Sequence, residues 1–175
     1  MRTLLVCLLV GSMTALAQAQ AQHQLSPRAE ERIQREVFHE LNMLPHYSIF
    51  DILSYQVQGS TVILSGKVRD PGLQKSAEDA VRHIEGVEKV VNKIQVLPGF
   101  PDDERIRVHI ARSFWDTGLM RYMMGGAPPI RIIVAAGKVT LEGIVGNEGD
   151  KAIARAKAAG VPGVISVENN LRVEK

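Results

Sequence analysis

Residues 60–68, Ser-Thr-Val-Ile-Leu-Ser-Gly-Lys-Val, and residues 137–145, Gly-Lys-Val-Thr-Leu-Glu-Gly-Ile-Val, decide the fold of this chain. In both stretches apolar residues alternate with polar ones, which is the period of a β-strand. The stretches belong to a repeat, because residues 60–96 align without a gap with residues 137–173, and eleven of these 37 positions are identical. Such a repeat indicates a duplicated unit of about 70 residues.

In the first copy, the segment before this strand predicts a helix and a β-hairpin. Ser26 and Pro27 are suited to the start of a helix. The apolar residues that follow recur at helical spacing and form one stripe, and they are Ile33, Val37, Leu41 and Leu44, with Pro45 as the stop. Leu53, Tyr55 and Val57 then alternate up to Gly59-Ser60, which predicts a hairpin with the strand that follows.

The segment after this strand predicts a second helix and a third strand. Asp70-Pro71 starts the helix, Gly86 closes it, and residues 90–96 make the strand. The second copy repeats the order, with a helix from about Asp103, a hairpin at Gly137-Lys138 and a final strand up to Val173. We therefore expect an α+β fold with two α-β-β-α-β units, each a three-stranded mixed sheet with two helices on one face.

The helices and hairpins of the two copies do not align at the same offset. The hairpins align at 77 residues, but the first helices align at 73. The second copy therefore carries about four extra residues, between Thr117 and Pro129. The predicted domains are 26–97 and 103–175, joined by the short linker 98–102.

The N-terminal residues 1–21 have the pattern of a secretory signal peptide. Arg2 precedes the short apolar run 4–10, and Ala-x-Ala sites predict cleavage after residue 17, 19 or 21. Cys7, the sole cysteine, leaves with this segment, so the mature chain has no disulfide. The sequence therefore predicts export to the periplasm, with a possible peripheral position on the outer membrane.

Composition and motifs argue against several functional classes. The chain has 21 Lys and Arg residues and 19 Asp and Glu residues, so it lacks the basic excess that nucleic-acid binding requires. None of the usual hydrolase, phosphate-binding or dinucleotide-binding motifs occurs, and the five histidines do not pair at metal-binding spacing. We expect no enzyme, no catalytic residues, no metal and no cofactor.

The repeated segments resemble the BON domain. The resemblance is carried by Gly66 and by Gly86-Val87 through Val96 in the first copy, and by Gly143 and Gly163-Val164 through Val173 in the second. It spans roughly residues 30–97 and 103–174. The resemblance implies a bacterial envelope protein of the dual-BON type, associated with osmotic protection and outer-membrane integrity, with phospholipid binding as its activity. It implies no catalytic residues.

The first helix of the second copy carries two apolar faces. Advancing 100° per residue from Ile106 puts Ile110 and Phe114 on the core face. A second group of residues, which lies opposite or just beyond it, forms the predicted membrane-binding or partner-binding site: Val108, Arg112, Trp115, Leu119, Arg121, Tyr122 and Met123. The same positions in the first copy are polar, with Arg35, His39 and Asn42. Gly118 could end the helix and leave residues 119–124 as an apolar loop.

Three explanations fit this second apolar face. Tryptophan and tyrosine beside arginine are typical of a bilayer interface, which favours an anionic phospholipid membrane surface. An envelope protein partner or the first copy could cover it instead, and ordinary core is the third possibility. The predicted function is reversible, non-enzymatic membrane attachment that supports envelope integrity and osmotic stress tolerance. The alternatives are a periplasmic protein-protein adaptor and, further off, a small-ion or ligand-binding module.

Overall fold

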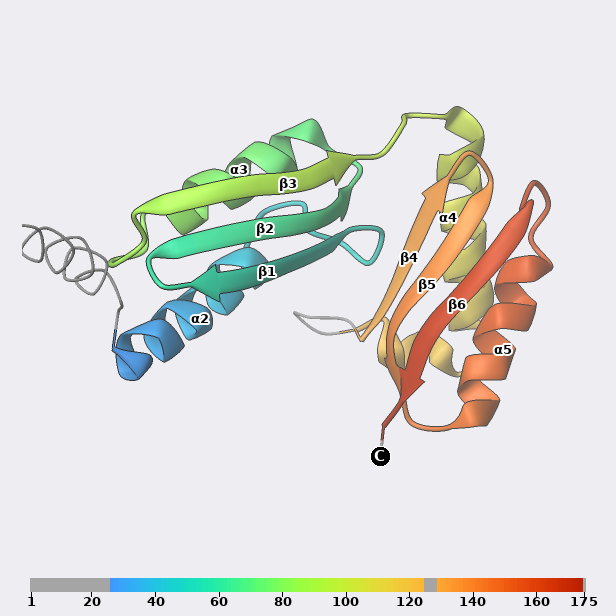
Figure 1. Ribbon diagram of the computed structural model, residues 1–175. Coiled ribbons are helices and arrows are strands. Elements are labelled where there is room, and N and C mark those ends of the chain that lie inside the picture. The colour runs from blue at the N-terminus through green and yellow to red at the C-terminus, as the bar shows by residue number, and fades with distance from the viewer. Residues whose placement is uncertain (1–25, 125–128, 175) are drawn as a thin grey trace, which may run out of the picture.

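The computed structural model describes residues 26–124 and 129–174. The predicted signal peptide lies outside the described residues. The chain forms two units of the same architecture, each with one three-stranded sheet (Figure 1). The predicted α+β fold with two α-β-β-α-β units is confirmed.

The first domain begins with a helix that its own sequence caps. Ser26 accepts a hydrogen bond from the backbone N–H of Ala29, and Pro27 occupies the first helical turn. The elements of this domain are α2 (Pro27–Asn42), β1 (Ile52–Gln58), β2 (Thr61–Val68), α3 (Pro71–Arg82) and β3 (Lys89–Val96). Ile33, Val37 and Leu41 of α2 are buried, as their spacing predicts.

The second domain repeats this order and adds one short helix. Its elements are α4 (Pro101–Trp115), the 3-10 helix η2 (Leu119–Tyr122), β4 (Ile130–Ala135), β5 (Lys138–Val145), α5 (Glu148–Ala159) and β6 (Ser166–Val173). The extra helix η2 lies in the segment where the two repeats lose their common spacing. The insertion predicted between residues 117 and 129 thus contains regular structure.

Both sheets have the same topology and register. β1 pairs antiparallel with β2, and β2 pairs parallel with β3; β4, β5 and β6 repeat the pattern. The repeated glycines Gly66 and Gly143 have φ values of 133° and 129°. A Cβ at either position would lie 2.0 Å or less from the carbonyl oxygen of Ile52 or Pro129. Only glycine fits this backbone, so the repeat preserves it.

Two helix ends differ from the sequence prediction. Gly86 does not close the second helix of the first domain, and its counterpart Gly163 does not close that of the second: the helices end earlier, at Arg82 and Ala159. Both glycines have φ values above 90° and lie in the turn that follows. Each helix ends four residues before its glycine, so the prediction that the glycine closes the helix is wrong.

The helices cover one face of each sheet, and the other face carries no helix. In both domains of Figure 1 the sheet lies in front of its two helices, so the two uncovered faces point toward the same side of the molecule. Each core lies between sheet and helices. In the described part of the chain, no helix is both long enough and apolar enough to span a bilayer.

Candidate functional site

The predicted core face of helix α4 is correct. Ile106, Ile110 and Phe114 are buried in the second core. The first turn carries three carboxylates, Asp102, Asp103 and Glu104, which suit the positive end of the helix dipole.

The opposite face of α4 exposes a tryptophan beside an unpaired arginine. The side chain of Trp115 is 59% exposed, Arg112 one turn before it is also exposed, and Val108 is half-buried. Within the described residues, the guanidinium of Arg112 has neither an ion pair nor a hydrogen bond. We call Val108, Arg112 and Trp115 the outer face of α4.

The second apolar stripe does not extend beyond Trp115, so this part of the prediction is wrong. The helix ends at Trp115, and Gly118 turns the chain with a φ of 75°. Leu119 consequently enters the core and is fully buried. The left-handed glycine breaks the helical period, and angles counted from Ile106 do not hold after it. Leu119 therefore cannot contact a membrane or a partner in this fold.

Tyr122 and Arg121 form a polar clasp between η2 and the start of α5. The hydroxyl of Tyr122 donates to Asp150 at 2.7 Å and accepts from the backbone N–H of Gly146 at 2.8 Å. Arg121 pairs with the same carboxylate, and its guanidinium lies 4.7 Å from the centre of the Tyr122 ring. The Tyr122 hydroxyl, and then Arg121, hold the pKa of Asp150 below its ordinary value.

The clasp and the packing beside it remove three more residues from the predicted binding site. Tyr122 is half-buried against the core, as is Met123. Arg121 is exposed, but its charge is already matched by Asp150. An anionic surface would therefore compete with an existing ion pair at Arg121, but not at Arg112.

The first domain does not cover the outer face of α4. Its contacts reach the edge of strand β4, through the loop between α2 and β1: the carbonyl of Ile49 accepts from the N–H of Ile132 at 2.8 Å. Ile49 and Phe50 also pack against the second core. The predicted alternative in which the first copy covers this face is therefore wrong, since Trp115 stays exposed.

A second contact in this loop uses Arg131 of β4. Its Nη1 donates to the carbonyl of Ser48 at 2.8 Å, and its guanidinium stacks 4.4 Å from the centre of the Tyr47 ring. Burial raises the pKa of the Tyr47 hydroxyl, although the Arg131 charge opposes this. No sequence pattern points to Arg131, which is buried where it contacts the first domain.

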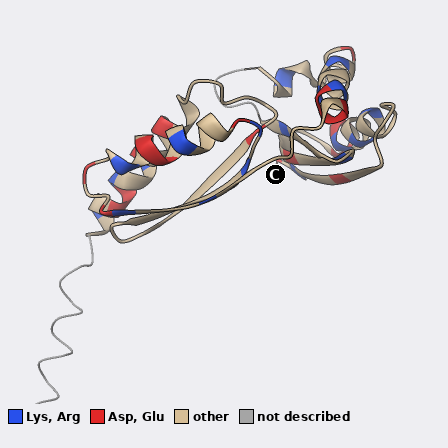
Figure 2. Cartoon of the chain, turned by 90° about the horizontal axis from the view of Figure 1, so that it is seen from above, with Lys and Arg blue, Asp and Glu red and all other residues tan. Residues whose placement is uncertain are grey.

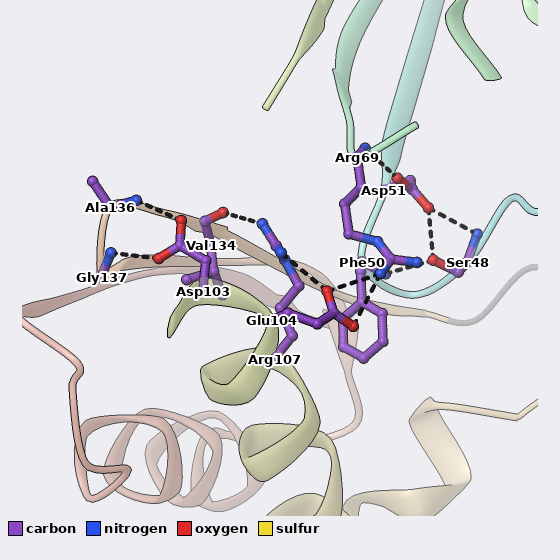
Figure 3. Close-up of polar contacts among 10 residues, drawn as sticks. All are labelled: Ser48, Phe50, Asp51, Arg69, Asp103, Glu104, Arg107, Val134, Ala136 and Gly137. Carbon is purple, nitrogen blue, oxygen red and sulfur yellow. Dashed lines mark hydrogen bonds and ion pairs between the residues drawn. The ribbon is translucent and has the colours of Figure 1, made fainter. Parts of the chain in front are cut away.

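A chain of polar contacts continues this interface toward the linker (Figure 3). Asp51 is buried and accepts from the Ser48 hydroxyl at 2.6 Å and from the backbone N–H of Arg69 at 2.8 Å. The Arg69 guanidinium then donates to Glu104 at 3.0 Å, and Glu104 also accepts from buried Arg107 at 3.2 Å. One carboxylate of α4 thus joins arginines from both domains.

Within the ranges 26–124 and 129–174, no group of three or more His, Cys, Asp or Glu side chains is placed to hold a metal ion.

The chain was compared with solved structures, with curated proteins and with protein families. Two solved structures of CdsD, a structural protein of the type III secretion system of Chlamydia trachomatis, one of them of its C-terminal domain, are similar to this chain. Each is 10% identical; the first covers 81% of this chain and 96% of its own with a TM-score of 0.34, and the second 82% and 94% with 0.32. These scores support no argument about function.

Among curated proteins, none matches the chain significantly. The BON domain family matches it twice, over residues 29–98 and 102–175, and so spans both α-β-β-α-β units and most of the sequence. The resemblance inferred from the glycine and valine pattern is thereby confirmed, and the chain belongs to the BON domain family as a tandem pair of BON domains.

Proposed function

We propose that this protein is a non-enzymatic envelope protein that attaches reversibly to an anionic phospholipid surface through the outer face of α4. The observation that carries the proposal is the exposed Trp115 beside the unpaired Arg112. An amphipathic aromatic ring and a free guanidinium on one helix face are suited to the boundary between lipid headgroups and acyl chains. The membership in the BON family supports an envelope role.

The divergence between the two copies gives further support. The equivalent face of α2 has Arg35, His39 and Asn42, and the Asn42 amide is bonded to the carbonyl of Phe38 at 2.7 Å. A position that is polar in one copy and tryptophan in the other is not required by the fold. Trp115 is therefore better explained by a binding role than by a structural one.

The expected affinity of one molecule is low. Transfer of Trp115 from water contributes about 1.5–3 kcal/mol, and Arg112 near anionic lipid about 1 kcal/mol. Because Leu119 is buried and Arg121 is paired, neither adds to this sum. A total of roughly 2.5–4 kcal/mol corresponds to dissociation constants in the millimolar range. Attachment of this strength is reversible and depends on the local density of lipid charge.

The fluorescence of Trp115 tests the proposal directly, because it is the sole tryptophan. The exposed indole should emit at long wavelength in buffer. Vesicles rich in anionic phospholipid should shift the emission to the blue, zwitterionic vesicles should not, and added salt should reverse the shift. Arg112→Glu should abolish the shift, whereas Arg35→Glu, the same charge change on the outer face of α2, should leave it intact.

Two results would overturn the proposal. One is an emission spectrum that anionic vesicles do not move at any lipid concentration. The other is an equal loss of the shift in the Arg112 and Arg35 variants, which would point to net charge and not to a site. A blue shift of the Trp115 emission that an envelope protein extract causes and that salt does not reverse would instead favour the adaptor function.

The proposal also includes a location and a physiological role. The N-terminal pattern predicts export, and the protein would act in the periplasm, as a peripheral protein of the outer membrane under this proposal. A strain that lacks it should show greater sensitivity to detergent and to osmotic shock. Complementation with the Trp115→Asn variant, which restores the residue type of the first copy, should fail if the outer face of α4 carries the role.

A further inference from the structure

A second charged surface lies on the uncovered face of the first sheet, away from the outer face of α4. The buried residues of β2, Val62, Leu64 and Val68, point to the helices, so the residues between them point the other way. The strand register then places twelve side chains on the uncovered face: Ile52, Ser54, Gln56, Gln58, Thr61, Ile63, Ser65, Lys67, Lys89, Val91, Lys93 and Gln95. We call these the lysine face.

The charge of the lysine face is of one sign. It holds three lysines, Lys67, Lys89 and Lys93, and none of its twelve residues is acidic. All three lysines are exposed, and none has an ion-pair partner in the part of the chain that the structure describes. In Figure 2, by contrast, the acidic residues of this domain gather on its helices. Unpaired charges of one sign on one face of a sheet favour an anionic partner.

The second domain lacks this feature. At the positions that correspond to the three lysines it has Ile144, Ser166 and Asn170. Its uncovered face mixes both signs of charge, with Arg131, Lys138 and Arg172 beside Glu142 and Glu168. The three lysines are therefore not a requirement of the shared fold.

The shape of the surface decides between an anionic chain and a flat membrane. Lys67 and Lys93 line a cavity of about 280 Å³ whose other wall comes from the second domain, from Ile133, Thr140 and Glu142. A flat bilayer cannot reach into a hollow between two domains, whereas a single extended polymer chain can. Glu142 makes one part of this wall acidic, and the Asn170 amide donates to it at 2.8 Å.

The neutral residues of the lysine face favour a sugar polymer. Hydroxyl and amide side chains share the face with the lysines, from Ser54, Gln56, Thr61 and Gln95 among others. Such groups can both donate to and accept from sugar hydroxyls. The face carries no aromatic ring on which nucleic-acid bases could stack. We propose that the lysine face binds an anionic glycan chain, independently of membrane attachment through α4.

Binding to a polygalacturonate oligomer, a carboxylated glycan, tests this proposal by calorimetric titration. The full chain without residues 1–21 should bind it, and should bind its uncharged methyl ester far more weakly. The variant Lys67→Gln/Lys89→Gln/Lys93→Gln should lose about tenfold or more in affinity, and the slope of log Kd against log salt should fall by about two. All three side chains are exposed, so circular dichroism should show an unchanged fold.

The matched control is Arg28→Gln/Arg35→Gln/Lys75→Gln. It removes the same charge from exposed positions on helices α2 and α3 that have no ion-pair partner among the described residues. This control and Arg112→Glu should both bind the glycan as the parent protein does, which separates the proposal from membrane attachment.

Several outcomes would overturn the proposal. These are equal losses in the lysine variant and its control, equal binding of the methyl ester, or absence of glycan binding by the parent protein. A lysine variant that keeps glycan binding but loses binding to anionic vesicles would assign the lysine face to a membrane instead.

Discussion

The two BON domains share a backbone but differ on the outer face of the first helix and on the uncovered face of the sheet. Gly66 and Gly143 occupy the same strained position, and the core residues Val62 and Leu64 recur as Val139 and Leu141. The outer helix faces differ, since Asn42 corresponds to Trp115. Duplication thus preserved the residues that pack or that permit a backbone turn. The exposed residues were free to acquire separate roles, and this is where we place the two proposed binding surfaces.

The domains also differ in how they use buried polar groups. In the second domain, buried Asp103 accepts from the N–H groups of Ala136 and Gly137 at 2.7 and 2.8 Å, which fastens helix α4 to its hairpin. The position that corresponds to Asp103 in the first domain is Glu30, which makes no such bond. Because a buried carboxylate must be satisfied, the attachment of α4 depends on this polar contact. The buried carboxylate of the first domain, Asp51, is instead satisfied by Ser48 and Arg69 and does not fasten the first helix to its hairpin.

The largest expected effect tests whether the two backbones are truly equivalent. Gly66→Ala and Gly143→Ala should each lower the free energy of unfolding by at least about 2 kcal/mol, because a Cβ would collide with a backbone carbonyl at positive φ. Urea denaturation measures this. Gly99→Ala in the linker, where no atom lies within 4 Å of the added Cβ, is the control and should change little. A clear difference between the losses of unfolding free energy in Gly66→Ala and Gly143→Ala would show that the two backbones are not equivalent.

The next effect should be confined to the second domain. Asp103→Asn should lower the free energy of unfolding by about 1–3 kcal/mol, because one backbone N–H of the hairpin loses its acceptor. Amide hydrogen exchange should then show faster exchange at Ala136 and Gly137. Glu30→Gln in the first domain should stay within about 0.5 kcal/mol of the parent protein. A comparable loss of unfolding free energy in Glu30→Gln would contradict the inference that only Asp103 has a structural role.

The clasp of η2 has no counterpart in the first domain and predicts a pH effect. Tyr122→Phe should cost about 1–2 kcal/mol at neutral pH, since two hydrogen bonds are lost. It should also raise the pKa of Asp150 toward its ordinary value, which a carbon-detected NMR titration measures.

The sign of this pH effect follows from the lowered pKa of Asp150. A carboxyl group with a lowered pKa stabilises the fold above its unfolded pKa, near about 4, and this stabilisation disappears as the pH falls through its folded value. The difference in stability between the parent protein and Tyr122→Phe should therefore shrink in acid. A difference that grows in acid would contradict the assignment.

The smallest expected effect concerns the junction between the domains. Glu104→Gln should cost about 1 kcal/mol or less, because this side chain is 51% exposed and solvent screens its charge. Its main result should be a change in domain orientation, visible in residual dipolar couplings between the two sheets. Asp102→Asn, which removes an exposed ion pair with Arg105 in the same helical turn, should leave the orientation unchanged. Equal changes of domain orientation in the two variants would show that Glu104 has no specific role in setting this orientation.

The candidate site shows where reasoning from the sequence holds and where it fails. Val108, Arg112 and Trp115 were placed on the outer face of α4 because helical periodicity is reliable within an unbroken helix. Leu119 was misplaced because Gly118, in the left-handed region, redirects the chain. The Tyr122 contact with Asp150 joins residues 28 positions apart, and no local pattern predicts such a pair. The lysine face could not be predicted from the sequence either, because Lys67 shares a face with Lys89 and Lys93 only through the pairing of β2 with β3.

The sequence by itself determined the duplication, the order of elements and the family, because repeats, periodicity and glycine positions are properties of the chain alone. The tertiary structure decided which side chains remain exposed. Trp115 stays free because the first domain docks on the edge of β4, and Arg131 is buried for the same reason. Exposure depends on contacts between residues that are distant in the chain, so only the folded arrangement of the two domains could fix the surfaces available for binding.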